Sequence, residues 1–403
     1  MKIVIHRYNS ICEPGYIDAF KALGMEVVED NLEMTEKTIP ADVRIGTIAE
    51  MILTHKPMFV FSINFFPYIS DICERLHVMY VCVSVDCPVA ELMTPAIRNE
   101  CNRVFLFDRR QYLEVAGENP GHIYHLPLGV NPLICAPENC DLLYDVSFIG
   151  SLYSEKNQYA AIRDDLSDKV RGMCDGVLAA QELLPGLDLA ESVVGDEIIG
   201  TEIKSEFNKY LPGALTDIED PVTDITAFWA VSGCLASELT VRDRLMLLSS
   251  VGESIKDMGR LHLFTRSDTS LLKQICPDID VHGGVSTLGE MPRVFASSRI
   301  NINTTMRAIR SGLPQRIWDV LGCGGFLLTD AHDEIPEFLE VGRHLDVYGS
   351  PEEACDKVRY YLTHEDERAA IAAAGYEEVT ERHTIPVRVA AMISMIMNGE
   401  PAL

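Results

Sequence analysis

Short apolar runs recur along the chain in two series, and a stretch typical of helix separates most runs from the next. Several runs, such as 58–64 and 78–85, are almost entirely apolar. Strands with one solvent-exposed face would alternate apolar and polar residues, so these runs predict parallel strands that helices cover on both faces. The predicted strands are 2–5, 25–29, 58–64, 78–85, 103–108 and 123–128, followed by 145–150, 261–265, 280–283, 299–303, 326–330 and 345–348.

Two β/α series in a chain of 403 residues predict two domains, because a single hydrophobic core seldom grows beyond about 250–300 residues. We expect an α/β protein in which two Rossmann-like, doubly wound domains face each other across a cleft. The expected limits are 1–140 and 141–384. Residues 155–259 carry few strand signals and several helical ones, such as 178–184 and 242–250, so we expect a mainly helical insertion in the second domain. Helices are also predicted at 351–363, 365–374 and 385–397.

Composition limits the possible partners and the location of the protein. The net charge of −27 disfavours general binding to nucleic acid or to anionic membranes. The first ten residues hold no apolar run long enough for a signal peptide, and the longest run, 78–85, is too short to span a bilayer. The twelve cysteines show no zinc-type pairing, so we expect reduced, mostly buried thiols, no metal site and a cytoplasmic protein.

Residues 291–318 are the strongest candidate for a binding site. The segment contains five arginines and no Asp, Glu or Lys, which makes it a local positive field in an acidic chain. It reads as a strand, a polar loop, and a turn at 311–314 that begins a helix. Free backbone N–H groups at a helix N-terminus, together with guanidinium groups, are the donors that a diphosphate prefers. The alternative is a solvated helical face whose arginines pair with acidic residues elsewhere.

Other donor-binding candidates lie near the ends of predicted strands of the second domain, where ligands of such domains bind. Arg266 or the glycines after His282 could contact a phosphate or a nucleobase, although a plain turn is the alternative. Glu334 could accept hydrogen bonds from ribose hydroxyls or simply complement a helix dipole. The predicted donor-binding set comprises Arg266, His282, Gly283, Asn303, Arg307, Arg310, Arg316, Gly325, Thr329 and Glu334.

In the first domain, three predicted strand ends converge on the same crevice. Asp86 is a candidate general base for an acceptor hydroxyl, or a holder of the donor sugar. It also precedes Cys87 and Pro88, where an ordinary turn residue would stand. His6 is a second candidate base. The predicted acceptor-side residues are Asn9, Asn64 and Phe65.

Several common motifs are missing. No GxGxxG follows the first strand, and there is no GxxxxGK[ST] and no GxSxG, which disfavours a NAD enzyme, a P-loop NTPase and an α/β-hydrolase. The one DxD, formed by Asp278 and Asp280, precedes its strand instead of following it. We therefore expect arginines, and not a metal ion, to neutralise a leaving diphosphate.

Spaced motifs over roughly 58–151 and 260–390 resemble the spore-maturation-protein (CgeB-like) glycosyltransferases. The resemblance implies a GT-B fold, with the donor nucleotide on the C-terminal domain and the acceptor facing the N-terminal one. It also implies that the last helix, 385–403, packs back onto the first domain. By position, Arg310, Arg316 and Glu334 fall where such enzymes hold diphosphate and ribose, whereas Cys87 departs from the expected Ser or Asp. The motifs are 62–67, 85–88, 105–108, 125–129, 145–151, 301–305, 310–316, 319–329 and 360–384.

The expected function is metal-independent transfer of a sugar, of the hexosyltransferase type, from a UDP- or GDP-linked donor to a hydroxyl group. The acceptor would be a glycan, a protein or a small molecule, and no cofactor is expected. Two alternatives stay open at this point. One is a nucleotide-sugar epimerase or hydrolase of the same fold, and the other is a non-catalytic module that binds nucleotide or glycan.

Overall fold

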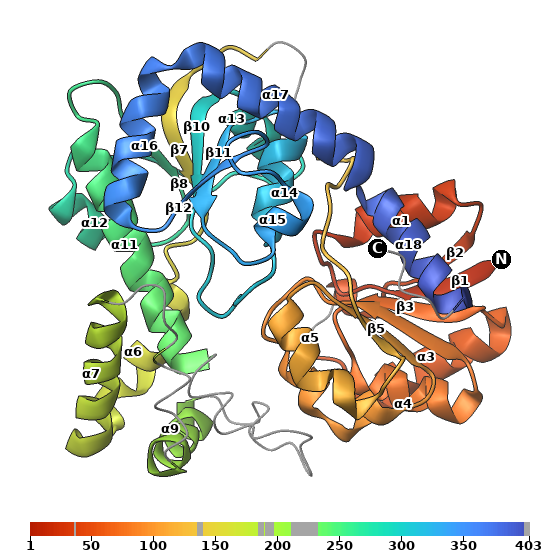
Figure 1. The fold of residues 1–403 in the computed structure, drawn as a ribbon. Helices are drawn as coiled ribbons and strands as arrows, with labels where there is room; N and C mark the ends of the chain where they lie inside the picture. Colours follow the sequence, from red (N-terminus) through yellow and green to blue (C-terminus); the bar gives the residue numbers. More distant parts are fainter. Residues whose placement is uncertain (36–37, 135–139, 184–188, 190–196, 211–232, 399–403) are drawn as a thin grey trace.

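A computed structural model describes residues 1–35, 38–134, 140–183, 189, 197–210 and 233–398. It contains two six-stranded parallel sheets with helices around them (Figure 1). The strand orders are β2-β1-β3-β4-β5-β6 and β12-β11-β10-β7-β8-β9. The predicted α/β class with two doubly wound sheets is confirmed.

Each strand overlaps one of the predicted strands, and the apolar runs are clearest in the middle of the sheets, where parallel strands are buried on both faces. The clearest case is β3, whose five residues are all buried. The first sheet consists of β1 (Lys2–His6), β2 (Glu26–Asp30), β3 (Phe59–Ile63), β4 (Met79–Val83), β5 (Asn102–Leu106) and β6 (Ile123–His125). The second consists of β7 (Tyr144–Ile149), β8 (Leu261–Phe264), β9 (Asp280–His282), β10 (Ser298–Asn303), β11 (Leu327–Asp330) and β12 (Asp346–Tyr348).

The helices begin and end at local signals. For example, Ser350 caps α16 by accepting a hydrogen bond from the backbone N–H of Glu353, and Pro351 takes the first helical position. Helices around the first sheet are α1 (Glu13–Ala22), α2 (Leu32–Thr35), α3 (Ala41–His55), α4 (Pro67–Leu76) and α5 (Arg109–Val115). Those after β8 are α12 (Ser270–Ile275), α13 (Met291–Ala296), α14 (Gln315–Gly322), α15 (Ile335–Phe338), α16 (Pro351–Thr363), α17 (Glu365–Arg382) and α18 (Ile385–Asn398).

The described residues between β7 and β8 are mainly helical. Part of this region has its own small core, which includes Tyr159, Leu178 and Ile203. The longest helix then enters the core of the second sheet through Leu247 and Val251, so the region is anchored to that sheet. Its helices are α6 (Gln158–Ile162), α7 (Asp168–Leu183), α9 (Glu197–Tyr210) and α11 (Ala236–Ser254).

The end of the chain returns to the first domain. After α17, helix α18 packs against α1 (Figure 1), and Val389 and Met392 join the core that contains Phe20. Arg388 is buried, donates a hydrogen bond from Nε to the carbonyl of Leu128 at 3.1 Å, and lies over the ring of Trp318. We propose to keep 1–140 and 141–384 as the domain limits, with α18 added to the first domain.

The two domains also meet at the buried carboxylate of Asp108. One oxygen caps α5 by accepting from the N–H of Gln111 at 2.8 Å. The other accepts from the N–H groups of Arg310, Ser311 and Gly312 at 2.8, 2.8 and 3.0 Å. Burial acts to raise the pKa of Asp108, but these backbone hydrogen bonds outweigh it and hold the pKa below its ordinary value. The loop before α14 therefore binds an anion, and in this structure the anion belongs to the first domain.

Gly312 allows this close approach. A Cβ atom at this position would lie 2.7 Å from the carbonyl oxygen of Phe107 and 2.8 Å from the Cα of Asp108. Both neighbours are backbone atoms, so neither can move aside without shifting the chain.

We expect Gly312→Ala to lower the free energy of unfolding by about 1–3 kcal/mol, the usual cost of overpacking a tight site. Thermal denaturation followed by circular dichroism would measure it. Gly172→Ala is the control, because nothing lies within 4 Å of a Cβ at that position of α7. An unchanged melting temperature for Gly312→Ala would show that this contact tolerates a side chain.

Candidate functional site

The site is built around the point where the strand order of the second sheet reverses. Ligands of doubly wound domains bind outside the carboxyl ends of the strands at such a point, which here lies between β7 and β10. Arg244 of α11 joins the two loops that leave these strands. Its guanidinium donates to the carbonyl of Ser151, and to the carbonyl of Thr304 at 3.1 Å.

Two guanidinium groups lie near this point without a close ion pair among the described residues. Arg244 is 8% exposed and its Nε has no hydrogen-bond partner there. Arg316, on the first turn of α14, lies over the ring of Phe295, and its nearest carboxylate oxygen, on Asp319, is 3.9 Å away. Burial lowers the pKa of both arginines, and the charge of Arg316 contributes to the shift at Arg244. The pair is therefore a favourable environment for an anion.

Other arginines of the predicted segment have acidic partners. Arg307 forms two hydrogen bonds, of 2.5 and 3.1 Å, with the carboxylate of Asp243 on α11. Arg310 forms an ion pair with Glu114 on α5 of the first domain. Both arginines therefore pair with acidic residues elsewhere in the chain, which is the alternative that the sequence left open. Diphosphate binding by Arg307 and Arg310 stays a prediction that would require these pairs to open.

Glu334 lies between the domains. Its side chain is buried, and its two oxygens accept from the backbone N–H of Arg109 at 2.9 Å and from Nε2 of His125 at 2.7 Å. It makes no capping hydrogen bond to α15. Ribose binding would require both interdomain bonds to break.

The predicted residues after β8 and β9 lie at the carboxyl edge of the sheet. Arg266 is exposed and packs against Gly284, where a Cβ would lie 2.4 Å from its Cγ. Gly283 borders open space. His282, in contrast, stacks on Phe264 with ring centroids 4.4 Å apart, which places it over the sheet instead of beyond its edge.

Asn303 and Thr329 are buried and hold the ends of β10 and β11 together. The amide of Asn303 donates to Oγ1 of Thr329 at 3.0 Å, and that hydroxyl donates to Asp330 at 3.0 Å. Gly325 lies before β11, at the opposite, amino edge of the sheet, where a Cβ would lie 2.6 Å from the amide of Asn301. This position argues against the predicted donor contact, since packing already requires a glycine there.

In the first domain, Asp86 is exposed and oriented by Asn64. The amide of Asn64 donates to the carboxylate of Asp86 at 2.6 Å and to the hydroxyl of Tyr8 at 3.1 Å. Its carbonyl accepts from the N–H of Val85 at 3.0 Å. Asn9 is also exposed and has a left-handed backbone, with φ of 74°. Asn64 therefore orients the carboxylate of Asp86, and its own side chain is only partly exposed to solvent.

Two predicted residues of the first domain are not accessible. His6 is 1% exposed, with Nδ1 2.8 Å from the carboxylate of Asp30 and Nε2 3.3 Å from the hydroxyl of Tyr68. Both ring nitrogens are engaged, so the structure does not place His6 where it could take a proton from an acceptor. Phe65 lies in the core against Tyr80, because the left-handed backbone of Asn64 ends the alternation of β3.

Carboxylates on elements of both sheets act on the thiol of Cys12. Burial raises the pKa of this thiol to about 12, and the negative charges of Asp319 and Asp86 add to the effect. Asp319 belongs to α14, one turn after Arg316, whereas Asp86 follows β4. The guanidinium of Arg316 and the exposed carboxylate of Asp86 therefore belong to elements of different sheets.

Sequence reasoning missed two features. Arg244 lies within the predicted helical insertion, and nothing in its local pattern connects it to the strand ends. His262, Asp280 and His282 form the one group among the described residues whose side chains are close enough to share a metal ion. The spacing of Asp280 and His282, two residues apart on a predicted strand, was a signal for this group.

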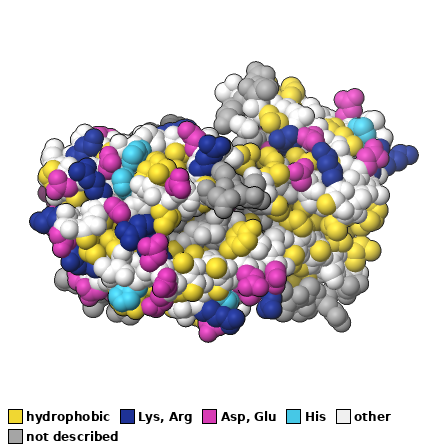
Figure 2. Space-filling view, turned by 90° about the horizontal axis from the view of Figure 1, so that it is seen from above, with side chains coloured by type: hydrophobic (Ala, Val, Ile, Leu, Met, Phe, Trp, Pro, Cys, Tyr) yellow, Lys and Arg dark blue, Asp and Glu magenta, His cyan; other side chains and the backbone are white. Residues whose placement is uncertain are grey.

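Most of the described cysteines are buried, and the surface carries charges of both signs. Of the twelve cysteines, Cys135 lies outside the described residues. On the face that Figure 2 shows, Lys and Arg side chains are interspersed with Asp and Glu. Among the described helices, none has the length and apolar character that crossing a membrane requires.

Comparison with known proteins relates this geometry to a family. Residues 248–394 match a family described as "Glycosyl transferase-like". The matched range begins within α11 and ends within α18. It includes Arg266 and Arg316 but not Arg244, which precedes the matched residues. No curated protein sequence gave a match.

Solved structures show that the chain has a GT-B fold. Anabaena HepE in complex with UDP and glucose has a TM-score of 0.54 at 9% identity, over 98% of this chain and 99% of that one. A glycosyltransferase from Rickettsia africae reaches 0.57 at 11% identity, over 99% of each chain. WaaG, a glycosyltransferase involved in lipopolysaccharide biosynthesis, reaches 0.53 at 10% identity, over 99% and 100%. At these identities the likeness shows the fold alone.

We expect Asp108→Asn to lower the free energy of unfolding by about 1–3 kcal/mol, because the amide would direct N–H groups at the donors of the loop before α14. The folded-state pKa of Asp108 lies below its unfolded value, which is about 3.9. The contribution of the carboxylate is therefore complete above that pH and is lost as the pH falls through the folded-state pKa.

The difference in stability between wild type and Asp108→Asn should accordingly shrink below a pH of about 4. Chemical denaturation over a pH series would measure it. Asp18→Asn, at an exposed position of α1, is the control and should change stability by less than about 0.5 kcal/mol. A difference that stays constant into acid would show that the ionised carboxylate is not what the loop recognises.

Proposed function

We propose that the protein is a glycosyltransferase that moves a sugar from a nucleotide-diphosphate sugar to an acceptor hydroxyl. The family match and the GT-B fold support this class. The observation that carries the proposal is Arg316, a partly buried guanidinium on the first turn of a helix at the carboxyl edge of the sheet, with no carboxylate oxygen nearer than 3.9 Å among the described residues.

A partly buried cation that lacks a hydrogen-bonded counter-ion has lost part of its hydration, and a diphosphate would supply charge-assisted hydrogen bonds. We place the diphosphate between Arg316 and the loops that Arg244 joins. The nucleoside would extend toward Arg266 and Gly283. UDP is the first donor nucleotide to test, since the HepE complex contains UDP, and GDP is the second.

In the reaction, the acceptor oxygen forms a bond to the anomeric carbon while the bond from that carbon to the diphosphate oxygen breaks. Guanidinium groups would stabilise the negative charge on the departing diphosphate, so we propose that no metal is needed at the phosphates. The exposed carboxylate of Asp86, oriented by Asn64, would take the proton of the acceptor hydroxyl. More specifically, we propose that the protein belongs to the CgeB-like subfamily and transfers a hexose.

Arg316→Ala should weaken donor binding by about 1.5–3 kcal/mol, the contribution of a hydrogen bond to a charged group. This corresponds to a 10- to 150-fold rise in Kd, roughly. Isothermal titration calorimetry with UDP, UDP-sugars and GDP would measure it. Arg343→Ala is the control, because Arg343 is exposed and pairs only locally with Glu340. Equal donor affinity in both variants would remove Arg316 from the site.

Asp86→Asn should reduce the transfer rate by about 10²- to 10⁴-fold, the usual contribution of a general base. Donor affinity should stay within about two-fold of wild type, because a general base acts on the acceptor hydroxyl and does not hold the bound donor. Release of nucleotide in the presence of an acceptor panel would report the rate, with the exposed Asp18→Asn as control. A parallel loss of donor affinity would show instead that Asp86 holds the donor sugar.

A second candidate is a nucleotide-sugar epimerase. A putative UDP-N-acetylglucosamine 2-epimerase from Listeria monocytogenes shares the fold, with a TM-score of 0.54 at 9% identity. Incubation with UDP-sugars alone separates the two functions. Isomerisation without an acceptor would favour the epimerase, and binding without any turnover would favour a non-catalytic module.

A further inference from the structure

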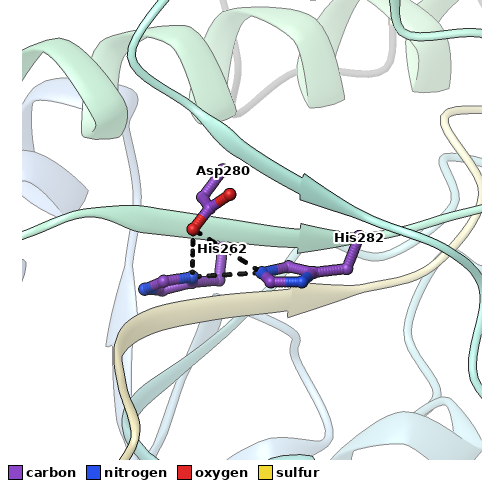
Figure 3. Close-up of side chains that lie close together, drawn as sticks. All are labelled: His262, Asp280 and His282. Atoms are coloured by element: carbon purple, nitrogen blue, oxygen red, sulfur yellow. Dashed lines mark hydrogen bonds and ion pairs between the residues drawn. The ribbon is translucent and has the colours of Figure 1, made fainter.

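A pair of neighbouring strands brings three possible metal ligands to one face of the second sheet. Asp280 and His282 are two residues apart on β9, so their side chains point to the same face. His262 of β8 lies directly opposite Asp280 in the parallel register. All three side chains therefore lie next to one another on the surface of the sheet (Figure 3).

The distances between their ligand atoms suit a bound ion. Nδ1 of His262 lies 3.2 Å from Nε2 of His282 and 3.4 Å from a carboxylate oxygen of Asp280, and that oxygen is 3.9 Å from Nε2 of His282. Around a tetrahedral zinc ion with bonds of about 2.0–2.2 Å, ligand atoms are separated by roughly 3.3–3.6 Å. Only the longest of the three separations would have to shorten.

A hydrogen bond between the two imidazoles does not satisfy the whole group. One shared proton bonds two nitrogen atoms, and no group among the described residues donates a hydrogen bond to the oxygen of Asp280 that faces them. A divalent cation would accept a lone pair from all three atoms. Two imidazoles and one carboxylate, with a coordination position left for water, form a ligand set that zinc uses.

The rings are also held in place while the site stays open. His282 stacks on Phe264, and the ring of Tyr144 meets the ring of His262 edge-on at 5.0 Å. The side chain of His262 is 12% exposed, whereas those of His282 and Asp280 are 33% and 44% exposed. Solvent, and therefore an ion, has access from the side of Asp280.

We propose that His262, Asp280 and His282 bind a divalent transition-metal ion, preferably Zn²⁺, which ties the short edge strand β9 to β8. Because only the folded chain brings the three ligands together, the ion should stabilise the folded state. The proposal does not depend on glycosyl transfer, since it concerns the sheet surface and is tested without a donor.

Titration of the metal-free full chain with Zn²⁺ tests it, with the bound stoichiometry measured after dialysis. Wild type should bind one ion with a raised melting temperature. His262→Ala, Asp280→Asn and His282→Ala should each weaken binding by at least about 10-fold, since even outer-shell changes cost 10- to 100-fold. His77→Asn is the matched control, an exposed histidine whose left-handed backbone, φ of 52°, suits asparagine.

Co²⁺ as a spectroscopic probe distinguishes this site from the twelve cysteines of the chain. Coordination by imidazole and carboxylate gives visible d–d bands without the intense near-ultraviolet band of a cobalt thiolate. Circular dichroism of the metal-free variants verifies that they fold, and Asp280→Asn keeps the side-chain shape. Equal Zn²⁺ affinity in wild type and the three cluster variants, or a thiolate band in wild type, would overturn the proposal.

Discussion

The contact between the carboxylate of Asp108 and the backbone N–H groups of the loop before α14 sets the position of the rest of the site. It is a buried ionic contact that crosses the domain boundary, and Gly312 makes it possible by leaving no side chain between the two backbones. Because this loop leads directly into α14, the same contact places Arg316 relative to the first domain. Glu334 reinforces it by accepting two further hydrogen bonds from that domain.

The arginines of residues 291–318 have different partners because they lie at different positions in the fold. Arg307 and Arg310 lie on the loop after β10, within reach of carboxylates on α11 and α5, and both are paired. Arg316 lies one element later, on the first turn of α14, where its nearest carboxylate is too far for a hydrogen bond. A chain with a net charge of −27 thus has a positively charged side chain, Arg316, near the point where the strand order of the second sheet reverses. The proposed diphosphate site and the proposed metal site use different parts of the same sheet.

Much of the fold follows from local sequence. Runs that are apolar at nearly every position are typical of central parallel strands, and two series of them in one chain predict two doubly wound sheets. The anion-binding character of the loop before α14 was also predictable, since it depends on backbone N–H groups at a strand-to-helix turn. The sequence alone therefore determined the architecture and the chemistry of that loop.

Only the tertiary structure decided which groups meet. Asp108 fills the loop because the domains approach each other there, a contact between residues about two hundred positions apart. The register of β8 and β9 places His262 opposite Asp280, which no local pattern specifies. His6 turns to Asp30 on the neighbouring strand instead of toward an acceptor. In each case the physical reason is the same: charge pairing and hydrogen bonding act over a few ångströms in space, whereas sequence periodicity reports only burial along one segment.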